Sequence, residues 1–337
     1  MVLTPIATVF GAYGHTGRFI VAELRKRGWN LVLSGRDAGK LSALAAEYGD
    51  LEARSASVDS PEALDRALAG SSLIINCAGP FLDTAEPILA AALRSGCHYL
   101  DVTAEQASAA ATYERFDESA RNAGLVVIPA MGFYGGLADL LATAALGEWA
   151  AADEIRIGIA LDSWRPTLGT RKTGQRNKAR RLIIANGGLV PLADPAPTDS
   201  WKFPEPFGTQ EVVELPFSET ILIARHLRVS ALHTYLNTTP LKDLRDPATP
   251  APAPADETGR SAQTFMVDVV VKNGSQTRRA TARGRDIYAV TAPLVAEAAQ
   301  RILDGSIQRR GVLAPGEVFD AATFLRALAP QHLLLEI

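Results

Sequence analysis

Short apolar runs alternate with longer amphipathic stretches through the first 130 residues of the chain. The short runs predict strands at residues 8–10, 30–36, 51–57, 99–103 and 125–129, and a further apolar run from residue 72 leads into a loop at 76–81. The longer stretches predict helices at residues 19–24, 38–48, 61–68, 85–95 and 106–122. Ser60 followed by Pro61 is typical of a helix start, and Asp37 is expected to cap the helix that follows it. This strand–helix alternation predicts an α/β fold with a doubly wound parallel sheet.

The pattern changes after about residue 150, where apolar and polar residues begin to alternate one by one. This alternation predicts strands at 154–161, 210–215, 226–230, 263–272 and 277–284. Asn273-Gly274 lies between the last two and is a typical hairpin turn. We therefore expect a second, mixed or antiparallel sheet, with surface loops at the Pro- and Ala-rich stretches 191–206 and 247–256. The apolar span 125–146 contains Asp139 and several glycines, so a buried strand, loop and helix are expected there instead of a membrane span.

A glycine-rich turn joins the first predicted strand to the first predicted helix. Gly11, Gly14 and Gly17 are spaced three residues apart, and Tyr13, His15 and Thr16 fill the turn between them. In a dinucleotide-binding unit these glycines permit a tight turn, close approach of the pyrophosphate, and close packing of helix on strand. The unpaired N–H groups at the helix start would then bind the pyrophosphate. The turn predicts a nucleotide-binding Rossmann unit.

The end of the second strand indicates which nucleotide binds. Ser34, Gly35 and Arg36 stand where an NAD enzyme usually has an acidic residue for the ribose 2′-hydroxyl, and Lys40 follows on the next helix. An arginine can hold a 2′-phosphate through a bidentate fork, so the sequence favours NADP. Asp59 follows the third strand, where it either accepts from the adenine amine or stabilises its own turn.

A second predicted contact with the cofactor follows the strand that begins near residue 72. The loop Cys77-Ala78-Gly79-Pro80-Phe81 leaves that strand at its carboxyl end, which is where ligands bind in doubly wound sheets. We therefore assign Cys77, Ala78, Gly79, Pro80 and Phe81 to the cofactor site.

Four motifs together resemble the saccharopine dehydrogenase-like oxidoreductases, a family that includes saccharopine reductases and trans-acting enoyl reductases. They are the glycine turn 11–18, Asn76 to Phe81, Gly96 to Glu105, and a tail formed by Tyr288 to Pro293 and Gly311 to Phe319. The resemblance implies a Rossmann domain, an inserted α/β domain that carries the substrate site, and a C-terminal segment that returns to the first domain. We place these at residues 1–130, 131–286 and 287–337. The chain departs from the family at Ala104, where glycine is frequent, and at Tyr134, where a carboxylate is frequent.

Composition is consistent with a soluble enzyme. The chain has 337 residues, 47% of them hydrophobic, and a formal net charge of −3, so its overall charge gives no reason to expect a nucleic-acid or membrane partner. Its two cysteines do not have the spacing of metal ligands, and no secretory signal is evident, so we expect a reducing compartment and a cytoplasmic location. No metal site is expected, and a homodimer remains open.

Candidate catalytic residues lie at the carboxyl ends of the predicted strands. Tyr134 and Asp101 are the preferred proton donors, Tyr99 and Glu105 are weaker candidates, and Asp101 or Glu105 could equally cap the helix at Gln106. Thr103, Gly169, Thr170 and Arg171 are assigned to the substrate. Between residues 165 and 181 lie seven basic residues and no acidic ones, which form either a solvated helix face or a basic wall for an anionic substrate.

These features predict an NADP-dependent oxidoreductase that reduces an imine or an activated C=C or C=O group of a small substrate. The alternative is an NADP-binding redox sensor without catalysis. Steady oxidation of NADPH with some member of a substrate panel would separate the two.

Overall fold

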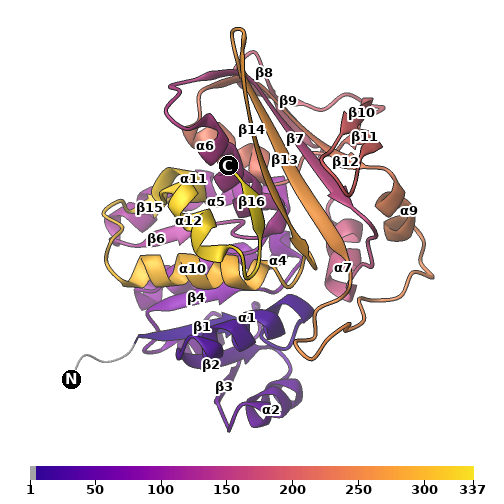
Figure 1. Ribbon diagram of the computed structural model, residues 1–337. Coiled ribbons are helices and arrows are strands. Elements are labelled where there is room, and N and C mark those ends of the chain that lie inside the picture. Colours follow the sequence, from indigo (N-terminus) through magenta and orange to yellow (C-terminus); the bar gives the residue numbers. More distant parts are fainter. Residues whose placement is uncertain (1–4) are drawn as a thin grey trace.

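A parallel sheet of seven strands, in the order β15-β6-β5-β4-β1-β2-β3, forms the first half of the fold (Figure 1). The computed structural model describes residues 5–337, so the first four residues of the predicted first domain lie outside the described part. The order reverses beside β1, which pairs with β2 on one side and β4 on the other. Ligands bind at such a reversal in doubly wound sheets. The strands are β1 (Ile6–Phe10), β2 (Asn30–Gly35), β3 (Glu52–Ser55), β4 (Leu73–Asn76), β5 (His98–Asp101), β6 (Val126–Ile128) and β15 (Gly311–Val312).

The helices between these strands begin largely where their capping residues predict. The Asp37 side chain accepts from the N–H of Lys40 at 3.0 Å, and Ser60 accepts from the N–H of Ala63 at 3.2 Å, so both predicted caps are confirmed. Two helices begin earlier than predicted. The helix predicted from residue 19 begins at His15. The helix predicted from residue 85 begins at Phe81, because its first N–H is bonded by a distant carboxylate described below. The helices are α1 (His15–Lys26), α2 (Ala38–Glu47), α3 (Pro61–Leu68), α4 (Phe81–Ser95) and α5 (Gln106–Asn122).

The second sheet is mixed and has nine strands, most of them in the order β10-β11-β12-β7-β13-β14-β16. β7 and β12 are parallel, whereas the β13–β14 hairpin turns where Asn273 pairs with Gln276, as predicted. The predicted strand at 226–230 starts later, at Val229, because His226 ends a helix, and the predicted loop 191–206 contains a strand. The strands are β7 (Ala152–Leu161), β8 (Leu182–Ala185), β9 (Gly188–Pro191), β10 (Thr198–Lys202), β11 (Thr209–Glu214), β12 (Val229–Asn237), β13 (Thr264–Asn273), β14 (Gln276–Arg285) and β16 (Leu334–Glu336).

The C-terminal segment contributes to both sheets. β15 pairs with β6 in the first sheet, and β16 pairs with β14 in the second. The C-terminal segment was predicted to return to the first domain; β15 does so, whereas β16 joins the second sheet. The domain boundaries at residues 130 and 286 stay a prediction. The remaining helices are η1 (Phe133–Leu137), α6 (Ala138–Leu146), α7 (Leu168–Arg176), α8 (Glu219–His226), α9 (Thr239–Arg245), α10 (Thr291–Leu303), α11 (Pro315–Val318) and α12 (Ala321–Leu328).

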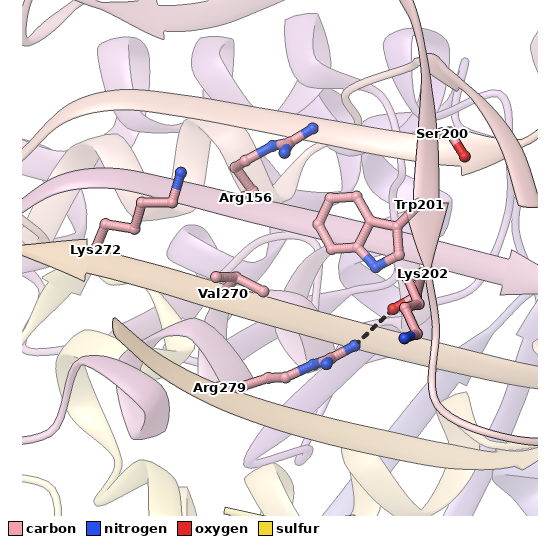
Figure 2. A pocket seen from close by; sticks show the side chains of 7 residues that line it. All are labelled: Arg156, Ser200, Trp201, Lys202, Val270, Lys272 and Arg279. Carbon is pink, nitrogen blue, oxygen red and sulfur yellow. Dashed lines mark hydrogen bonds between the residues drawn. The ribbon is translucent and has the colours of Figure 1, made fainter. Parts of the chain in front are cut away.

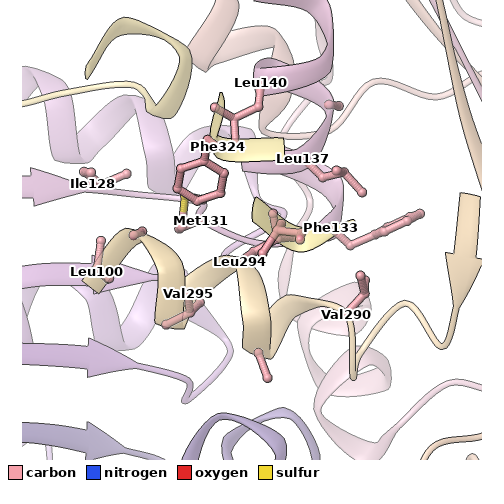
Figure 3. Close-up of a cluster of buried hydrophobic side chains, with 14 of the residues drawn as sticks. Leu100, Ile128, Met131, Phe133, Leu137, Leu140, Val290, Leu294, Val295 and Phe324 are labelled. Carbon is pink, nitrogen blue, oxygen red and sulfur yellow. The ribbon is translucent and has the colours of Figure 1, made fainter. Parts of the chain in front are cut away.

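A shared hydrophobic cluster joins the two sheets (Figure 3). Leu100 comes from β5, Phe133 from the segment after β6, and Leu294 and Phe324 from the C-terminal helices, and each is at most 3% exposed. Complete burial of such a side chain stabilises a fold by roughly 1.5–3 kcal/mol. The C-terminal helices are therefore part of the core.

No helix in residues 5–337 has the length and hydropathy needed to cross a membrane. In the same residues, His, Cys, Asp and Glu side chains do not form a group of three or more that could hold a metal ion.

Candidate active site

The glycine turn between β1 and α1 is packed as tightly as a dinucleotide-binding turn must be. Gly11 has a φ of +79°, and a Cβ added to Gly17 would lie 2.3 Å from the carbonyl oxygen of Gly11. A Cβ added to Gly14 would lie 3.0 Å from the same oxygen. The turn is held against β2, because the N–H groups of Gly11 and Ala12 both donate to the Ser34 carbonyl. Side chains at these positions would separate α1 from β1.

The start of α1 offers uncapped backbone donors beside this turn. No side chain caps the helix, and its first turn carries no acidic residue. The N–H groups of such a turn have no partner within the helix, and the helix dipole favours an anion there. The close glycine backbone and the uncapped helix start therefore fit the pyrophosphate of a dinucleotide.

The residues at the end of β2 fit the 2′-phosphate of NADP. Arg36 and Lys40 are exposed, and the Lys40 ammonium lies 5.7 Å from the centre of the Tyr13 ring. Asp37 turns its carboxylate toward α2, where backbone hydrogen bonding at Lys40 lowers its pKa. The one acidic residue beside Arg36 is thus engaged as a helix cap.

Two predicted cofactor contacts face elsewhere in the structure. The Ser34 hydroxyl is buried and donates to the carbonyl of Arg54 at 2.8 Å, so its side chain supports the sheet, not a ligand. Asp59 is exposed, and its carboxylate accepts from the Ser57 hydroxyl at 3.0 Å, which is the turn-stabilising alternative. The ring of His15, the first residue of α1, packs at nearly right angles against Phe19 and Tyr288, and its Nε2 is buried without a partner in residues 5–337.

The loop from Cys77 to Phe81 lies at the carboxyl end of β4 and leads directly into α4. The Asn76 side chain accepts from the N–H of Ala78 and so fixes the start of this loop. The Glu105 carboxylate accepts from the N–H of Phe81 at 2.8 Å. Glu105 therefore caps α4 instead of its own helix α5, and burial raises the pKa of its carboxyl. Burial also raises the pKa of the Cys77 thiol.

Asp101 occupies the end of β5 and has no exposed surface. Its carboxylate accepts from the Tyr99 hydroxyl and from the N–H groups of Thr103 and Ala130, all within 3.0 Å. Burial raises the pKa of this carboxyl to about 6. Its three donors and its burial favour a role in holding the ends of β5 and β6 in place, and its assignment as a proton donor stays a prediction.

Tyr134 lies in a column of stacked side chains between the two sheets. Its ring stacks on Phe217 at a centroid distance of 4.1 Å and lies 5.4 Å from Trp164. The Arg181 guanidinium covers the Phe217 ring at 4.9 Å and closes the column. The Tyr134 hydroxyl is buried without a hydrogen-bond partner in residues 5–337. Burial raises its pKa well above the usual value for tyrosine, so the phenol stays protonated.

The column is tied to the end of β5 by a single side chain. The Ser218 hydroxyl donates to the carbonyl of Thr103 at 3.0 Å and lies 3.2 Å from the carbonyl of Tyr134. Thr103 itself is buried, and its hydroxyl accepts from the N–H of Glu105. The structure thus brings the predicted residues Tyr134, Asp101 and Thr103 to the same edge of the first sheet.

Of the predicted substrate contacts on α7, Arg171 faces away from this edge. Its guanidinium donates to the carbonyls of Asp246 and Thr249, which belong to the loop after α9. Gly169 is exposed, and Thr170 hydrogen bonds with the Tyr288 hydroxyl at 2.9 Å. Gly169 and Thr170 belong to the first turn of α7, which the Thr167 side chain caps.

Three important residues escaped sequence reasoning, namely Phe217, Glu219 and Tyr288. Glu219 is fully buried, its Oε1 accepts from the N–H of Phe217, its Oε2 has no partner in residues 5–337, and burial raises its pKa to about 7. An acidic residue at the start of an apolar helix can be seen in the sequence, but only the fold shows that it is buried and what lies beside it. Tyr288 begins the motif Tyr288 to Pro293, for which the sequence indicates no role.

A separate basic pocket lies on the face of the second sheet opposite α6 (Figure 2). It has a volume of about 170 Å³, and the Trp201 indole forms one wall. Its cations are largely paired with carboxylates, so it offers little charge to a ligand; the pairs are Arg156 with Asp199, Lys272 with Glu154 and Arg279 with Asp268. Another cavity, of about 300 Å³, lies beside Tyr288 and Arg165.

Comparison with known proteins agrees with the geometry of the first domain. Residues 7–128 match the family model described as the saccharopine dehydrogenase NADP binding domain. The first domain therefore resembles the NADP-binding domain that this model describes, in agreement with NADP as the cofactor.

Two relatives are similar to part of the chain. A probable mitochondrial saccharopine dehydrogenase-like oxidoreductase of Arabidopsis thaliana is 28% identical over 141 residues, which cover 37% of this chain and 31% of that protein. The saccharopine dehydrogenase-like oxidoreductase of Bos taurus is 28% identical over 153 residues, covering 39% of this chain and 35% of that protein. The chain therefore matches about a third of the length of these relatives, and the resemblance seen in its motifs is confirmed.

A solved structure extends the fold likeness to the whole chain. Apo saccharopine dehydrogenase (L-Glu forming) from Saccharomyces cerevisiae superposes with a TM-score of 0.71 at 14% identity. The match covers 98% of this chain and 99% of the yeast chain. At this identity it shows a common fold, and the predicted α/β class with a second mixed sheet is confirmed.

Proposed function

We propose that this chain is an NADP-dependent oxidoreductase that reduces an imine, or an activated C=C or C=O group, of a small anionic substrate. The observation that carries the proposal is the position of the Tyr134 hydroxyl. It is a buried, unpartnered oxygen on a residue whose backbone carbonyl is tied through Ser218 to Thr103, at the edge of the sheet to which the glycine turn directs the dinucleotide. Bound NADPH supplies a hydride, and the protein orients the substrate and supplies a proton.

Tyr134 is proposed as the proton donor. Its raised pKa keeps the hydroxyl protonated, and its lack of a partner leaves the proton available to a substrate atom. A buried polar group without a partner lowers stability, so a substrate that accepts this hydrogen bond gains from it. Asp101 contributes by holding the loops around Thr103 and Ala130, not by contact with the substrate.

Arg181 is proposed to bind the anionic group of the substrate, in place of Arg171. Its guanidinium donates to the carbonyl of Pro216 and lies over Phe217, next to Tyr134 in the column. Among residues 5–337 it makes no salt bridge, and the carboxyl that acts on its charge is that of buried Glu219. A planar, permanently charged guanidinium suits a carboxylate or phosphate. Arg171 is held by two backbone carbonyls of the loop after α9.

The proposal is tested by following NADPH oxidation with a panel of imines, enones and keto acids, each compared with its neutral ester or amide. We expect turnover with at least one acid, and Arg181→Gln should raise KM for that acid at least roughly tenfold while Arg171→Gln leaves it unchanged. NADPH binding without turnover of any compound would favour the redox sensor. Turnover that ignores the charge of the substrate would exclude the role given to Arg181.

A further inference from the structure

Tyr288 joins three parts of the molecule that the sequence places far apart. Its hydroxyl accepts from the indole N–H of Trp164 at 3.2 Å and from the N–H of Thr167 at 3.3 Å. It also hydrogen bonds with the Thr170 hydroxyl at 2.9 Å. The same ring packs at right angles against the ring of His15, with centroids 5.3 Å apart and planes at 90°. One side chain thus contacts both the glycine turn and the start of α7.

Tyr288 is itself held firmly by the residue that begins its turn. Asp286 is fully buried at a φ of +62°, and its carboxylate accepts from the N–H groups of Tyr288, Ala289 and Ser261. A non-glycine residue in this conformation is uncommon and marks a constrained position. The backbone of Tyr288 is therefore held in place, so its side chain can position the residues that it contacts.

The helix that Tyr288 positions covers the cofactor edge of the first sheet. A Cβ added to Gly79 would lie 2.9 Å from the Thr173 hydroxyl, and Arg176 forms an ion pair with Asp83 in the first turn of α4 at 2.8 Å. Thr170, Thr173 and Arg176 are spaced three residues apart and so lie along one face of α7. Figure 1 shows α7 between the second sheet and the end of α1 nearest the glycine turn.

The rest of α7 has little to hold it in place. None of its residues is buried, and Leu168 is 68% exposed. A short helix without buried residues opens locally at low free energy. The position of α7 therefore depends on the contacts at its ends, of which the Tyr288 hydroxyl provides the N-terminal set.

We infer that Tyr288 is a positioning residue that couples the glycine turn to α7, so that dinucleotide binding at the turn fixes α7 over the site. The inference rests on the proposed function for the identity of the bound dinucleotide. The coupling passes from His15, at the first position of α1, through the Tyr288 ring to the cap of α7.

The test is hydrogen–deuterium exchange of the peptide covering residues 164–176, with and without saturating NADPH. In the wild-type protein NADPH should slow this exchange. In Tyr288→Phe the helix should exchange about fivefold faster or more, since at least one hydrogen bond of ordinary strength is lost, and NADPH should no longer slow it. Tyr113→Phe, which removes a buried hydroxyl without a partner on α5, should behave as the wild type.

Thr170→Val removes the bond from the side of α7 and serves if Tyr288→Phe fails to fold. It should lose the NADPH-dependent slowing while it still binds NADPH, as measured by calorimetry. Slowing that persists in a variant, or that is absent from the wild-type protein saturated with NADPH, would overturn the inference. Failure of the wild-type protein to bind NADPH would refute the proposed cofactor. In that case, faster exchange of residues 164–176 in the variants without nucleotide would still show that the Tyr288 hydroxyl holds α7.

Discussion

Replacing Tyr134 by phenylalanine separates a chemical role from a packing role. The change removes only a hydroxyl, and the stack on Phe217 at 4.1 Å remains. A buried hydroxyl without a partner lowers stability by roughly 1–3 kcal/mol, so its removal should raise the free energy of unfolding by about 1 kcal/mol. Loss of a proton donor should lower kcat roughly 10²–10⁴-fold, which corresponds to about 3–5 kcal/mol in the activation barrier. Stability and turnover should therefore move in opposite directions.

Tyr113→Phe is the matched control for this experiment. Tyr113 is 4% exposed, and its hydroxyl also lacks a partner within residues 5–337, but it lies on α5 beneath Arg225. Both variants should show a small rise in Tm by calorimetry, and only Tyr134→Phe should lose turnover of the substrate found in the panel. If Tyr134→Phe turns over as fast as Tyr113→Phe, Tyr134 is a packing residue and the proton comes from another group.

Three further outcomes follow from the structure. Arg36→Ala should weaken NADPH binding by roughly 1.5–3 kcal/mol in calorimetry and leave NADH binding nearly unchanged. The control Arg18→Ala removes an exposed partner of Glu47 and should change the binding of neither nucleotide. An equal loss for both nucleotides in Arg36→Ala would contradict the 2′-phosphate assignment. Burial raises the pKa of Glu219 to about 7 from an unfolded value near 4.5, so the native state holds a proton that the unfolded state releases, and Tm should fall as the pH rises through this window. Glu219→Gln should flatten that fall, and a wild-type Tm that rises between pH 5 and 7 with no change in the variant would contradict the reasoning. Ending the chain after Gly284 should give insoluble protein, because α10 and α12 complete the hydrophobic cluster in Figure 3. A soluble truncated chain that binds NADPH would show that the first domain does not need these two helices.

The sequence correctly predicted the elements whose conformation depends on residues close together in the chain. The glycine turn, the caps at Asp37 and Ser60, and the Asn273-Gly274 hairpin all depend on residues within a few positions of one another. The same holds for β2, β4 and β6 of the first sheet, since each contains a continuous apolar run. These are the features that a single sequence can specify without knowledge of the fold.

Side-chain assignments failed where the partner is distant in the chain. Glu105 has the right position to cap α5, yet its carboxylate bonds to Phe81 because β4 and β5 are neighbours. Arg171 and Arg181 are equivalent in a run of basic residues, and only the loop after α9 and the Phe217 ring distinguish them. A strand within the Pro-rich stretch forms because Thr198 to Lys202 pairs with β11, which the composition of that stretch does not indicate.

The division of the last residues between the two sheets has a consequence for synthesis on the ribosome. The first sheet lacks its edge strand until Gly311 and Val312 have been made, and by then every strand of the second sheet except β16 has emerged. Until that point β6 presents an unpaired edge, and Leu100 and Phe133 lack the cover of α10. Exposed edges and apolar surface favour association with other chains. A nascent chain that stalls before α10 should therefore be a strong client for chaperones, although its nucleotide-binding turn was made first.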